Sequence, residues 1–201
     1  MAPIALGILG SGKGSNCRAI LEQIRAGKLE AHCRIVISDV AEAGIVKVAE
    51  EFHVPTAYIP PGKFRTKLEP EIEERLVQLL VGAGVELVVL AGFMRVLKSH
   101  MLKAFPRRMI NIHPSLLPKY PGREAWKQAL EAGEKITGCT VHYVDAGVDT
   151  GEIIAQREVP ILPGDIPETL HERIQKVERE IYPEVIRGLA LNRSASHLGA
   201  L

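Results

Sequence analysis

The sequence has few cysteines, few aromatic residues and almost no net charge. Cys17, Cys33 and Cys139 are scattered over 201 residues without a CxxC pair, which excludes a disulfide framework and favours a reducing compartment. The 25 basic and 24 acidic residues give a net charge of +1, too little to favour nucleic acid or a membrane surface as partner. No apolar run reaches the roughly 18 residues of a membrane helix. We therefore expect a cytoplasmic protein that binds neither nucleic acid nor a membrane.

The composition is that of an ordinary globular protein, with 46% hydrophobic and 24% charged residues. Apolar runs alternate with amphipathic segments from the first residues to about Asn192, which predicts an α/β fold. We expect a single-domain, doubly wound, mostly parallel twisted sheet with helices on both faces, over residues 1–192, followed by a flexible tail at 193–201. Ligands of such sheets bind beyond the carboxyl ends of the strands.

The apolar pattern also predicts where the individual elements lie. Strands are expected at 4–9, 34–37, 55–59, 85–90, 109–112, 140–144 and 153–159. Helices are expected over about ten residues from Asn16 and at 45–51, 69–81, 99–105, 124–131 and 167–189.

A glycine-rich turn, GSGKGSN at 10–16, lies between the first strand and the first helix. A P-loop requires Ser or Thr where Gly14 stands, so that interpretation fails at its magnesium ligand. A dinucleotide fingerprint is weakened because Ser15 occupies its third glycine position, although Asp39 could serve as the ribose acid. A turn without any ligand is also possible. The simplest functional interpretation is a monophosphate nest made by Gly14, Ser15 and Asn16.

Asn111 and His113 alternate with isoleucines, so both polar side chains are expected on one face at the end of the fifth strand. An amide donor beside a histidine suits a developing oxyanion. Asp149, in the later loop 145–151, is expected to pair with the imidazole and raise its pKa. A structural histidine and an Asx turn are the alternatives. The pattern does not suit zinc, and Ser115 lacks a nucleophile elbow, so we expect neither a metal site nor a serine nucleophile.

Two further polar positions stand out less clearly. Gln175 and Glu178 are three residues apart on the last helix and share a face, which by default is a solvated face. His142 alternates with apolar residues in a strand and is expected to pack beneath the site, without a catalytic role.

Four segments together resemble a known family: GSGKGSN at 10–16, AGFMRVL at 91–97, NIHPSLLPKYPG at 111–122 and DAGVDTG at 145–151. They are similar to the phosphoribosylglycinamide formyltransferases, folate-dependent enzymes of purine synthesis with a Rossmann-like formyltransferase fold. The GSN turn makes this resemblance narrower than one to all users of 10-formyltetrahydrofolate. Methionyl-tRNA formyltransferases and formyltetrahydrofolate deformylases look similar but carry an additional domain. The resemblance divides the chain into a phosphate-binding half, 1–100, and a folate-binding and catalytic half, 101–192.

The resemblance implies that the amine of glycinamide ribonucleotide attacks the formyl carbon of 10-formyltetrahydrofolate, the co-substrate, with no metal. Asn111 and protonated His113 would stabilise the oxyanion, and His113 would also protonate the leaving folate nitrogen. Asp149 would hold the imidazole charged. The protein would act on these small molecules as a monomer or a weak homodimer.

The same resemblance assigns the binding residues. The ribonucleotide would contact Gly14, Ser15, Asn16, Pro114, Gln175 and Glu178. The folate would contact Arg65, Met94, Arg95, Val96, Leu97, Asn111, Asp145, Ala146, Gly147, Val148 and Asp149. The chain departs from several relatives at Glu124 and Trp126, where they have histidines.

Two other functions remain open at this point. Within enzymes, the formyl group could go to another phosphorylated amine, or to water with release of formate. Outside enzymes, the chain could be a nucleotide-binding module that uses 10–16 and Asp39 and has no use for Asn111, His113 and Asp149.

Overall fold

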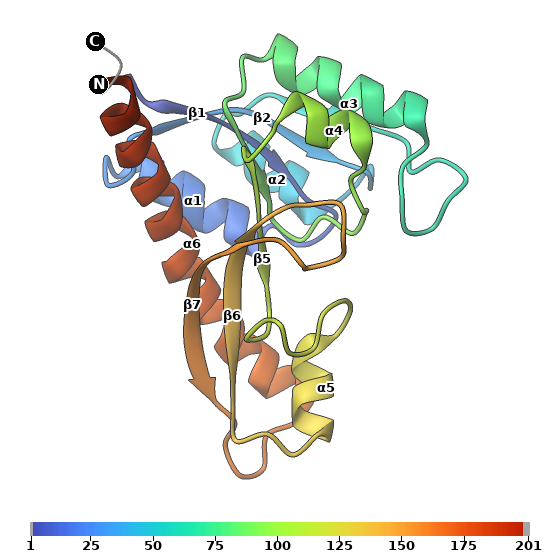
Figure 1. Ribbon diagram of the computed structural model, residues 1–201, viewed down its shortest axis with the longest axis vertical. Coiled ribbons are helices and arrows are strands. Elements are labelled where there is room, and N and C mark those ends of the chain that lie inside the picture. The colour runs from blue at the N-terminus through green and yellow to red at the C-terminus, as the bar shows by residue number, and fades with distance from the viewer. Residues whose placement is uncertain (1, 199–201) are drawn as a thin grey trace.

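The computed structural model describes the backbone of residues 2–198 and the side chains up to residue 193 (Figure 1). The strands are β1 (Ile4–Leu9), β2 (Ala31–Ser38), β3 (Thr56–Tyr58), β4 (Leu87–Leu90), β5 (Met109–His113), β6 (Ile136–Tyr143) and β7 (Ile153–Pro160). The helices are α1 (Ser15–Arg25), α2 (Gly44–Glu51), α3 (Pro70–Gly82), α4 (Ser99–Ala104), α5 (Ala125–Glu131) and α6 (Pro167–Leu198). The order of elements is the predicted one.

The strands form one seven-stranded sheet in the order β3-β2-β1-β4-β5-β6-β7. The five strands from β3 to β5 run parallel, as expected for a doubly wound fold. β6 runs antiparallel to β5, and β7 runs antiparallel to β6. The sheet is therefore mostly parallel, with a hairpin added at one edge.

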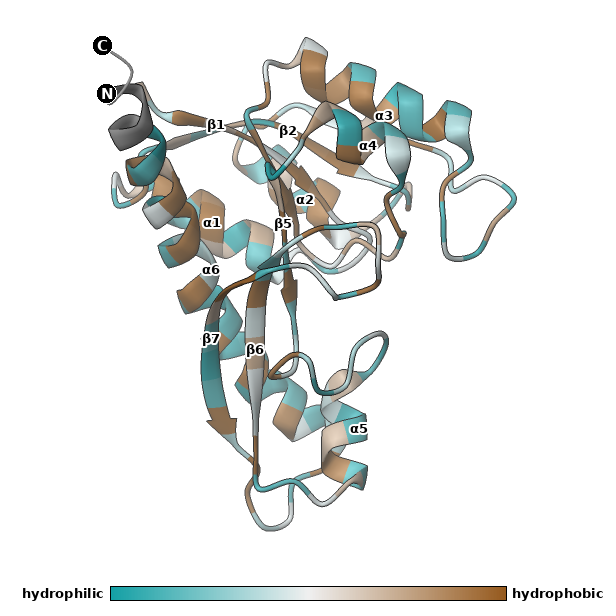
Figure 2. Ribbon diagram, in the orientation of Figure 1, coloured by the Kyte–Doolittle hydropathy of each residue, from teal (hydrophilic) through white to brown (hydrophobic). Residues whose placement is uncertain are grey.

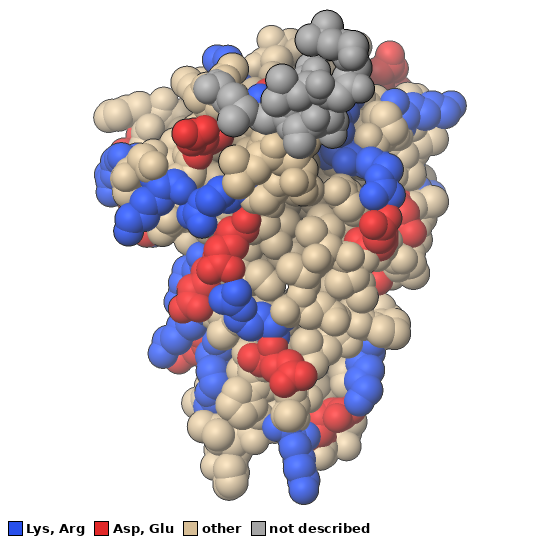
Figure 3. Space-filling view, turned by 60° about the vertical axis from the view of Figure 1, so that its left-hand side comes forward, with Lys and Arg blue, Asp and Glu red and all other residues tan. Residues whose placement is uncertain are grey.

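The sheet is covered on both faces because successive side chains of a strand point to opposite sides. In β4, Leu87 and Val89 join a core cluster that includes residues of α1, α2 and α6. Val88 and Leu90 join a second cluster, with residues of α3 and α4. Figure 2 shows the consequence: β1 is mostly hydrophobic, whereas the surrounding helices alternate hydrophobic and hydrophilic residues. On the side where α1 and α6 lie, basic and acidic side chains are interspersed (Figure 3).

Some predicted boundaries are wrong. β6 begins at Ile136 and not at Thr140, because β7 pairs with its first residues, whose sequence alone is a poor strand signal. Gly138 is required there, since a Cβ at this position would lie 2.1 Å from the Arg157 carbonyl oxygen.

The last helix is longer than predicted. α6 continues from Pro167 to Leu198 and includes Pro183, so residues 193–198 are helical and the expected flexible tail is wrong for them. Residues 199–201 of that expected tail lie outside the described residues. The helix is anchored by Tyr182, fully buried, whose hydroxyl lies 2.9 Å from the Leu90 carbonyl and 3.1 Å from the Ile110 carbonyl. Among the described side chains, the last α6 residues that pack against the core are Leu189 and Ala190, so the apolar pattern located the end of the packed part of the helix.

Candidate active site

The glycine-rich turn is held in place through its backbone. Gly14 has φ +81°, a left-handed conformation, and a Cβ there would lie 2.7 Å from the Ile45 Cα. The Ser11 amide donates to the Gly92 carbonyl, and the Ile45 amide donates to the Gly12 carbonyl. α1 therefore starts at Ser15 from a fixed position, and its first amides have no acceptor within the helix, an arrangement that favours an anion.

Asp39 is not free to bind a ribose. Its side chain is 2% exposed, its Oδ2 lies 2.6 Å from Arg95 Nε, and its Oδ1 accepts a 2.5 Å hydrogen bond from Ser11 Oγ. Arg95 Nη1 also donates to the carbonyls of Phe64 and Arg65. Asp39 and Arg95 thus join the glycine turn to the loop after β4, and the dinucleotide interpretation loses its acidic residue.

The predicted solvated face of the last helix is wrong at Glu178. Glu178 and Asn16 are 6% and 9% exposed, and Asn16 Nδ2 donates to Glu178 Oε2 over 3.0 Å. Burial raises the pKa of Glu178. Among the described residues, Asn16 Oδ1 has no hydrogen-bond partner. Gln175 is half-buried one turn earlier, with its Nε2 3.3 Å from His171 Nε2.

The structure brings Asn111, His113 and Asp149 together. His113 Nδ1 lies 3.3 Å from Asp149 Oδ2, and Asn111 Nδ2 lies 3.5 Å from Asp149 Oδ1. Asp149 has φ +56° and accepts a 2.8 Å hydrogen bond from the Gly122 amide, which ties its loop to the segment after β5. Because β6 is antiparallel, this loop starts near the beginning of β5, where the Val144 amide donates to the Met109 carbonyl, and reaches the other two side chains from there.

Both ring nitrogens of His113 face oxygen acceptors, since Nε2 also lies 2.8 Å from the Tyr120 carbonyl. A neutral imidazole satisfies one of these acceptors and an imidazolium satisfies both. Burial lowers the pKa of His113, the Asp149 carboxylate and the Tyr120 carbonyl raise it, and His142 lowers it again. Asp149 acts in the predicted direction, but burial has the larger effect and the pKa of His113 ends below its ordinary value.

Asp149 stays ionised because of its neighbours. Burial alone would raise its pKa, but His142, His113 and the Gly122 amide together lower it. His142 is 2% exposed and lies beneath the site, as predicted. Its Nε2 is 3.2 Å from Asn111 Nδ2, while its Nδ1 is 2.8 Å from the Tyr143 carbonyl. The contact with the Asn111 amide was not predicted; the pairing of β5 with β6 places the two residues opposite one another.

Most of the residues expected to contact a folate lie on two loops, after β4 and after β6, while Asn111 lies on β5 and Arg65 in the segment between β3 and α3. Met94 and Val148 are 63% and 50% exposed, so each presents apolar surface on its loop. Leu97 is 2% exposed and packs in the core, so only its backbone is available. Asp145 Oδ1 accepts hydrogen bonds from the Gly147 amide and the Thr150 hydroxyl, which shapes the second loop.

The other predicted residues differ in how far their side chains are exposed. Arg65, Ala146 and Gly147 are exposed, and Pro114 and Val96 are half-buried. Ser115 is fully buried and donates to the Lys119 carbonyl over 2.6 Å, which agrees with its dismissal as a nucleophile.

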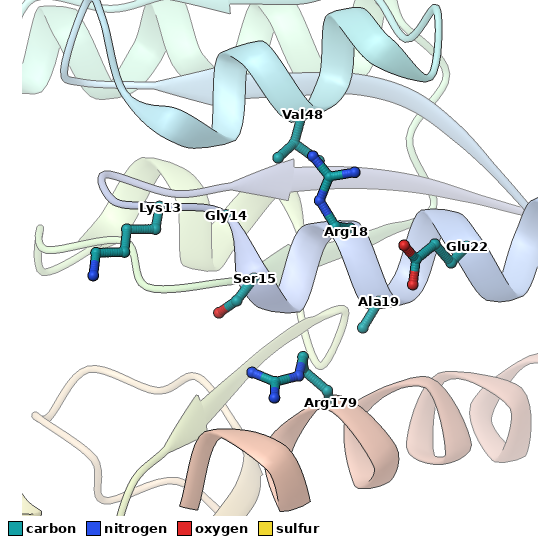
Figure 4. A pocket seen from close by; sticks show the side chains of 8 residues that line it. All are labelled: Lys13, Gly14, Ser15, Arg18, Ala19, Glu22, Val48 and Arg179. Carbon is teal, nitrogen blue, oxygen red and sulfur yellow. The ribbon is translucent and has the colours of Figure 1, made fainter. Parts of the chain in front are cut away.

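A cavity of about 400 Å³ lies at the start of α1 (Figure 4), and Asn111, His113 and Asp149 are not among the residues that line it. Its lining is Lys13, Gly14, Ser15, Arg18, Ala19, Glu22, Val48 and Arg179.

Within residues 2–198, no three His, Cys, Asp or Glu side chains are grouped as a metal site. None of the described helices is long and apolar enough to cross a membrane.

The sequence was compared with protein families and with characterised proteins. The formyl transferase family matches residues 5–186. This chain belongs to that family. The phosphoribosylglycinamide formyltransferase of Bacillus subtilis (strain 168) is 41% identical over 182 residues, which are 90% of this chain and 92% of that enzyme. The trifunctional purine biosynthetic protein adenosine-3 of Bos taurus is 40% identical over 91% of this chain, but the match is 18% of that protein.

Solved structures of formyl transferase relatives have the same fold. Glycinamide ribonucleotide transformylase 1 from Symbiobacterium toebii superposes with a TM-score of 0.91 at 46% identity, over 96% of this chain and 90% of that one. The corresponding protein from Geobacillus kaustophilus gives a TM-score of 0.87 at 40% identity, over 94% and 99% of the two chains. The predicted α/β formyltransferase fold is confirmed.

Proposed function

We propose that this formyl transferase is a phosphoribosylglycinamide formyltransferase. It transfers the formyl group of 10-formyltetrahydrofolate to the amine of glycinamide ribonucleotide in purine biosynthesis, giving formylglycinamide ribonucleotide and tetrahydrofolate. The observation that carries this proposal is the cluster of Asn111, His113 and Asp149 in a chain that also keeps an anion-binding turn at 14–16. The named relatives support the choice of acceptor.

Attack of the amine on the formyl carbon produces a tetrahedral intermediate with a negative oxygen, and Asn111 is its proposed donor. The Asn111 amide nitrogen donates toward His142 over 3.2 Å and toward Asp149 over 3.5 Å. The second bond is long, so a developing oxyanion can compete for that hydrogen. Removing one such donor in other enzymes costs on the order of 10²–10³ in rate.

His113 and Asp149 supply charge and a proton path. The Asp149 carboxylate, 3.3 Å from His113 Nδ1, stabilises the imidazolium as negative charge develops beside it. To donate a proton to the leaving nitrogen, His113 must first break one of its two hydrogen bonds. The bond to Asp149 is longer than the bond to the Tyr120 carbonyl and is therefore the weaker of the two. Because burial lowers the pKa of His113, the proton it holds is readily released.

The ribonucleotide is held by the turn and by α6 in this proposal. Gly14, Ser15 and Asn16 receive the phosphate, with Pro114 and Gln175 lining the path toward the reacting amine. Asn16 Oδ1 and the buried Glu178 can each accept a hydrogen bond from a sugar hydroxyl.

The loops after β4 and β6 are a suitable site for a folate ring. Met94 and Val148 offer exposed apolar surface for the ring faces. The backbone N–H and C=O groups of the same two loops can form hydrogen bonds with the polar edges of the ring. When bound, the 10-formyl derivative supplies an activated formyl group attached to nitrogen. Arg95 orders the first loop through Asp39, and Asp145 orders the second. Arg65 is proposed to lie nearer the glutamyl tail.

The three free and buried cysteines support the reducing cytoplasm as the location, and a monomer or weak homodimer stays a prediction.

The proposal is tested by following folate absorbance after the protein is mixed with 10-formyltetrahydrofolate, with and without glycinamide ribonucleotide. We expect turnover that requires the ribonucleotide and falls at least about a hundredfold in His113→Ala. His32→Ala, exposed on β2, is the matched control and should keep full turnover. Release of formate without the ribonucleotide would indicate a deformylase, and tight nucleotide binding without reaction would indicate a binding module.

A further inference from the structure

A stacked pair of rings joins α5 to the first turns of α6, which lie beside it (Figure 1). The rings of Trp126 and His171 have centroids 3.7 Å apart and planes 3° apart. Trp126 is half-buried and also packs against the core cluster that contains residues of α6. The stack therefore fixes the plane in which the two ring nitrogens of His171 lie.

One of those nitrogens faces the side-chain amide of Gln175. His171 Nε2 lies 3.3 Å from Gln175 Nε2, one helical turn further along α6. An amide nitrogen carries two hydrogens and accepts none, so Gln175 is the donor and His171 Nε2 the acceptor. The imidazole is then neutral, with its hydrogen on Nδ1. The charges around His171 agree with this form, because burial lowers its pKa most, Lys13 lowers it further, and the opposing effect of Glu172 is smaller.

This contact leaves the other end of the Gln175 amide available. Among the described residues, none donates a hydrogen bond to Gln175 Oε1. Gln175 is half-buried and lies between His171 and Glu178 on one face of α6, and Glu178 joins that face to the start of α1 through Asn16. A carbonyl oxygen in this place can accept a hydrogen bond from a hydroxyl or N–H group of a ligand.

We propose that His171 is a positioning residue for Gln175, which it holds with the amide carbonyl oxygen turned to a hydroxyl or N–H group of the acceptor substrate. This inference rests on the proposed function, both for the identity of the acceptor and for the assignment of Gln175 to it. Without a hydrogen-bond acceptor at position 171, either end of the Gln175 amide can face the substrate, and one of these orientations sets an amide N–H against a substrate donor. Trp126 contributes by holding the imidazole plane.

The test measures KM and kcat in a double-mutant cycle of His171→Phe and Gln175→Leu, with His32→Phe as control. Phenylalanine keeps a flat ring against Trp126 but has no acceptor nitrogen, and His32 is exposed on β2. Loss of one neutral hydrogen bond corresponds to about a three- to tenfold change in affinity. We expect KM for glycinamide ribonucleotide to rise by that factor in His171→Phe, with kcat and the KM for the folate within about twofold of wild type.

The cycle separates positioning from a merely structural role. Because His171 acts through Gln175, His171→Phe should raise KM no further when Gln175→Leu is already present. His32→Phe should leave all of these constants unchanged. An equal rise with and without Gln175 would overturn the positioning role, and so would a wild-type KM in His171→Phe.

Nitrogen NMR of the histidine rings tests the same contact without turnover. At neutral pH, His171 should carry its hydrogen on Nδ1 and none on Nε2, and its signals are identified by their loss in His171→Phe. A hydrogen on Nε2, in a neutral or a charged ring, would overturn the proposal because two donors would then face each other.

Calorimetric titration of glycinamide ribonucleotide repeats the cycle without the folate. If wild type binds the ribonucleotide with the expected dependence on His171 and Gln175 but transfers no formyl group, the positioning role stands and the proposed function is wrong. If wild type transfers the formyl group and His171→Phe binds the ribonucleotide as tightly as wild type does, the proposed function stands and the positioning role is wrong. Absence of ribonucleotide binding in wild type would overturn both.

Discussion

The two ends of the site are held in different ways. At the acceptor end, Gly14, Ser15 and Asn16 are consecutive, and a left-handed glycine sets their backbone. At the proposed catalytic end, Asn111, His113 and Asp149 come from a strand and a distant loop and meet only through tertiary contacts. The first arrangement involves consecutive residues and can therefore be recognised in the sequence as a short motif. The second depends on strand pairing and on the path of a loop, and it is sensitive to the exact charge of each group.

The largest expected effect concerns the catalytic end. Asp149→Asn keeps the size of the side chain but removes the negative charge beside His113 Nδ1 and puts a donor where the Gly122 amide now donates. We expect turnover to fall on the order of 10²–10³, with a much smaller change in folate affinity. Steady-state kinetics and folate titration measure the two effects.

Glu152→Gln is the control for that variant. Glu152 follows the same loop, and its carboxylate forms an exposed ion pair with Arg107 over 2.7 Å. Such pairs contribute little, so turnover should stay within about twofold of wild type. Turnover by Asp149→Asn at the wild-type level would remove Asp149 from the mechanism and with it the contrast between the two ends.

The next largest effect concerns the acceptor end. Gly14→Ala forces a side chain into a left-handed conformation and against Ile45, so the free energy of unfolding should fall by about 1–3 kcal/mol. The start of α1 should shift as well, raising KM for the ribonucleotide more than it changes kcat. Urea unfolding and steady-state kinetics provide the measurements.

Gly12→Ala offers a matched control within the same turn. A Cβ at Gly12 would have nothing within 4 Å, and its φ is not in the left-handed range. Its cost should be close to zero. Equal destabilisation by both substitutions would mean that the turn tolerates no side chain anywhere and that Gly14 has no special backbone role.

The smallest effect is a pH dependence that only the catalytic end should show. Because the pKa of folded His113 is lowered, its neutral form stabilises the fold above the ordinary histidine pKa of about 6.5. That stabilisation is lost as pH falls from there through the folded pKa, since the unfolded chain then binds more protons. Urea unfolding between pH 7.5 and 5 should show a shallower loss in His113→Gln than in wild type. An identical slope in both, with His32→Gln as reference, would contradict the lowered pKa.

Much of this architecture was predictable because the apolar pattern is strong. The order of strands and helices followed from periodicity, and the alternation in β5 correctly placed Asn111 and His113 on one face. Boundaries were less predictable where the local pattern is weak, as at the start of β6, which pairs with β7, and at the end of α6, which continues past its apolar residues. The burial of Glu178 had no local signal either, since its partner Asn16 lies far away in the chain.

The charged and polar residues of the site also have contacts that the sequence did not predict. Arg95 was expected to face a folate with its backbone, which stays a prediction, and the structure adds that its guanidinium is directed to Asp39 and to two backbone carbonyls of another loop. His142 was expected beneath the site, and its contact with the Asn111 amide appeared only when β5 and β6 were seen to pair. Arg179 carried no motif at all and stands out only because it lines a cavity beside Ser15.

The sequence by itself determined the fold class, and it singled out the glycine-rich turn and the side chains that we propose to react, because each depends on short-range pattern or on residue chemistry. Tertiary structure alone decided which charges are already paired, which side chains are buried and which cations remain free. Those properties depend on desolvation and on distances between segments far apart in the chain, and such distances are set by packing. The net effect on His113 illustrates this: the sequence supplied the carboxylate that raises its pKa, and burial in the folded protein lowered it further than that.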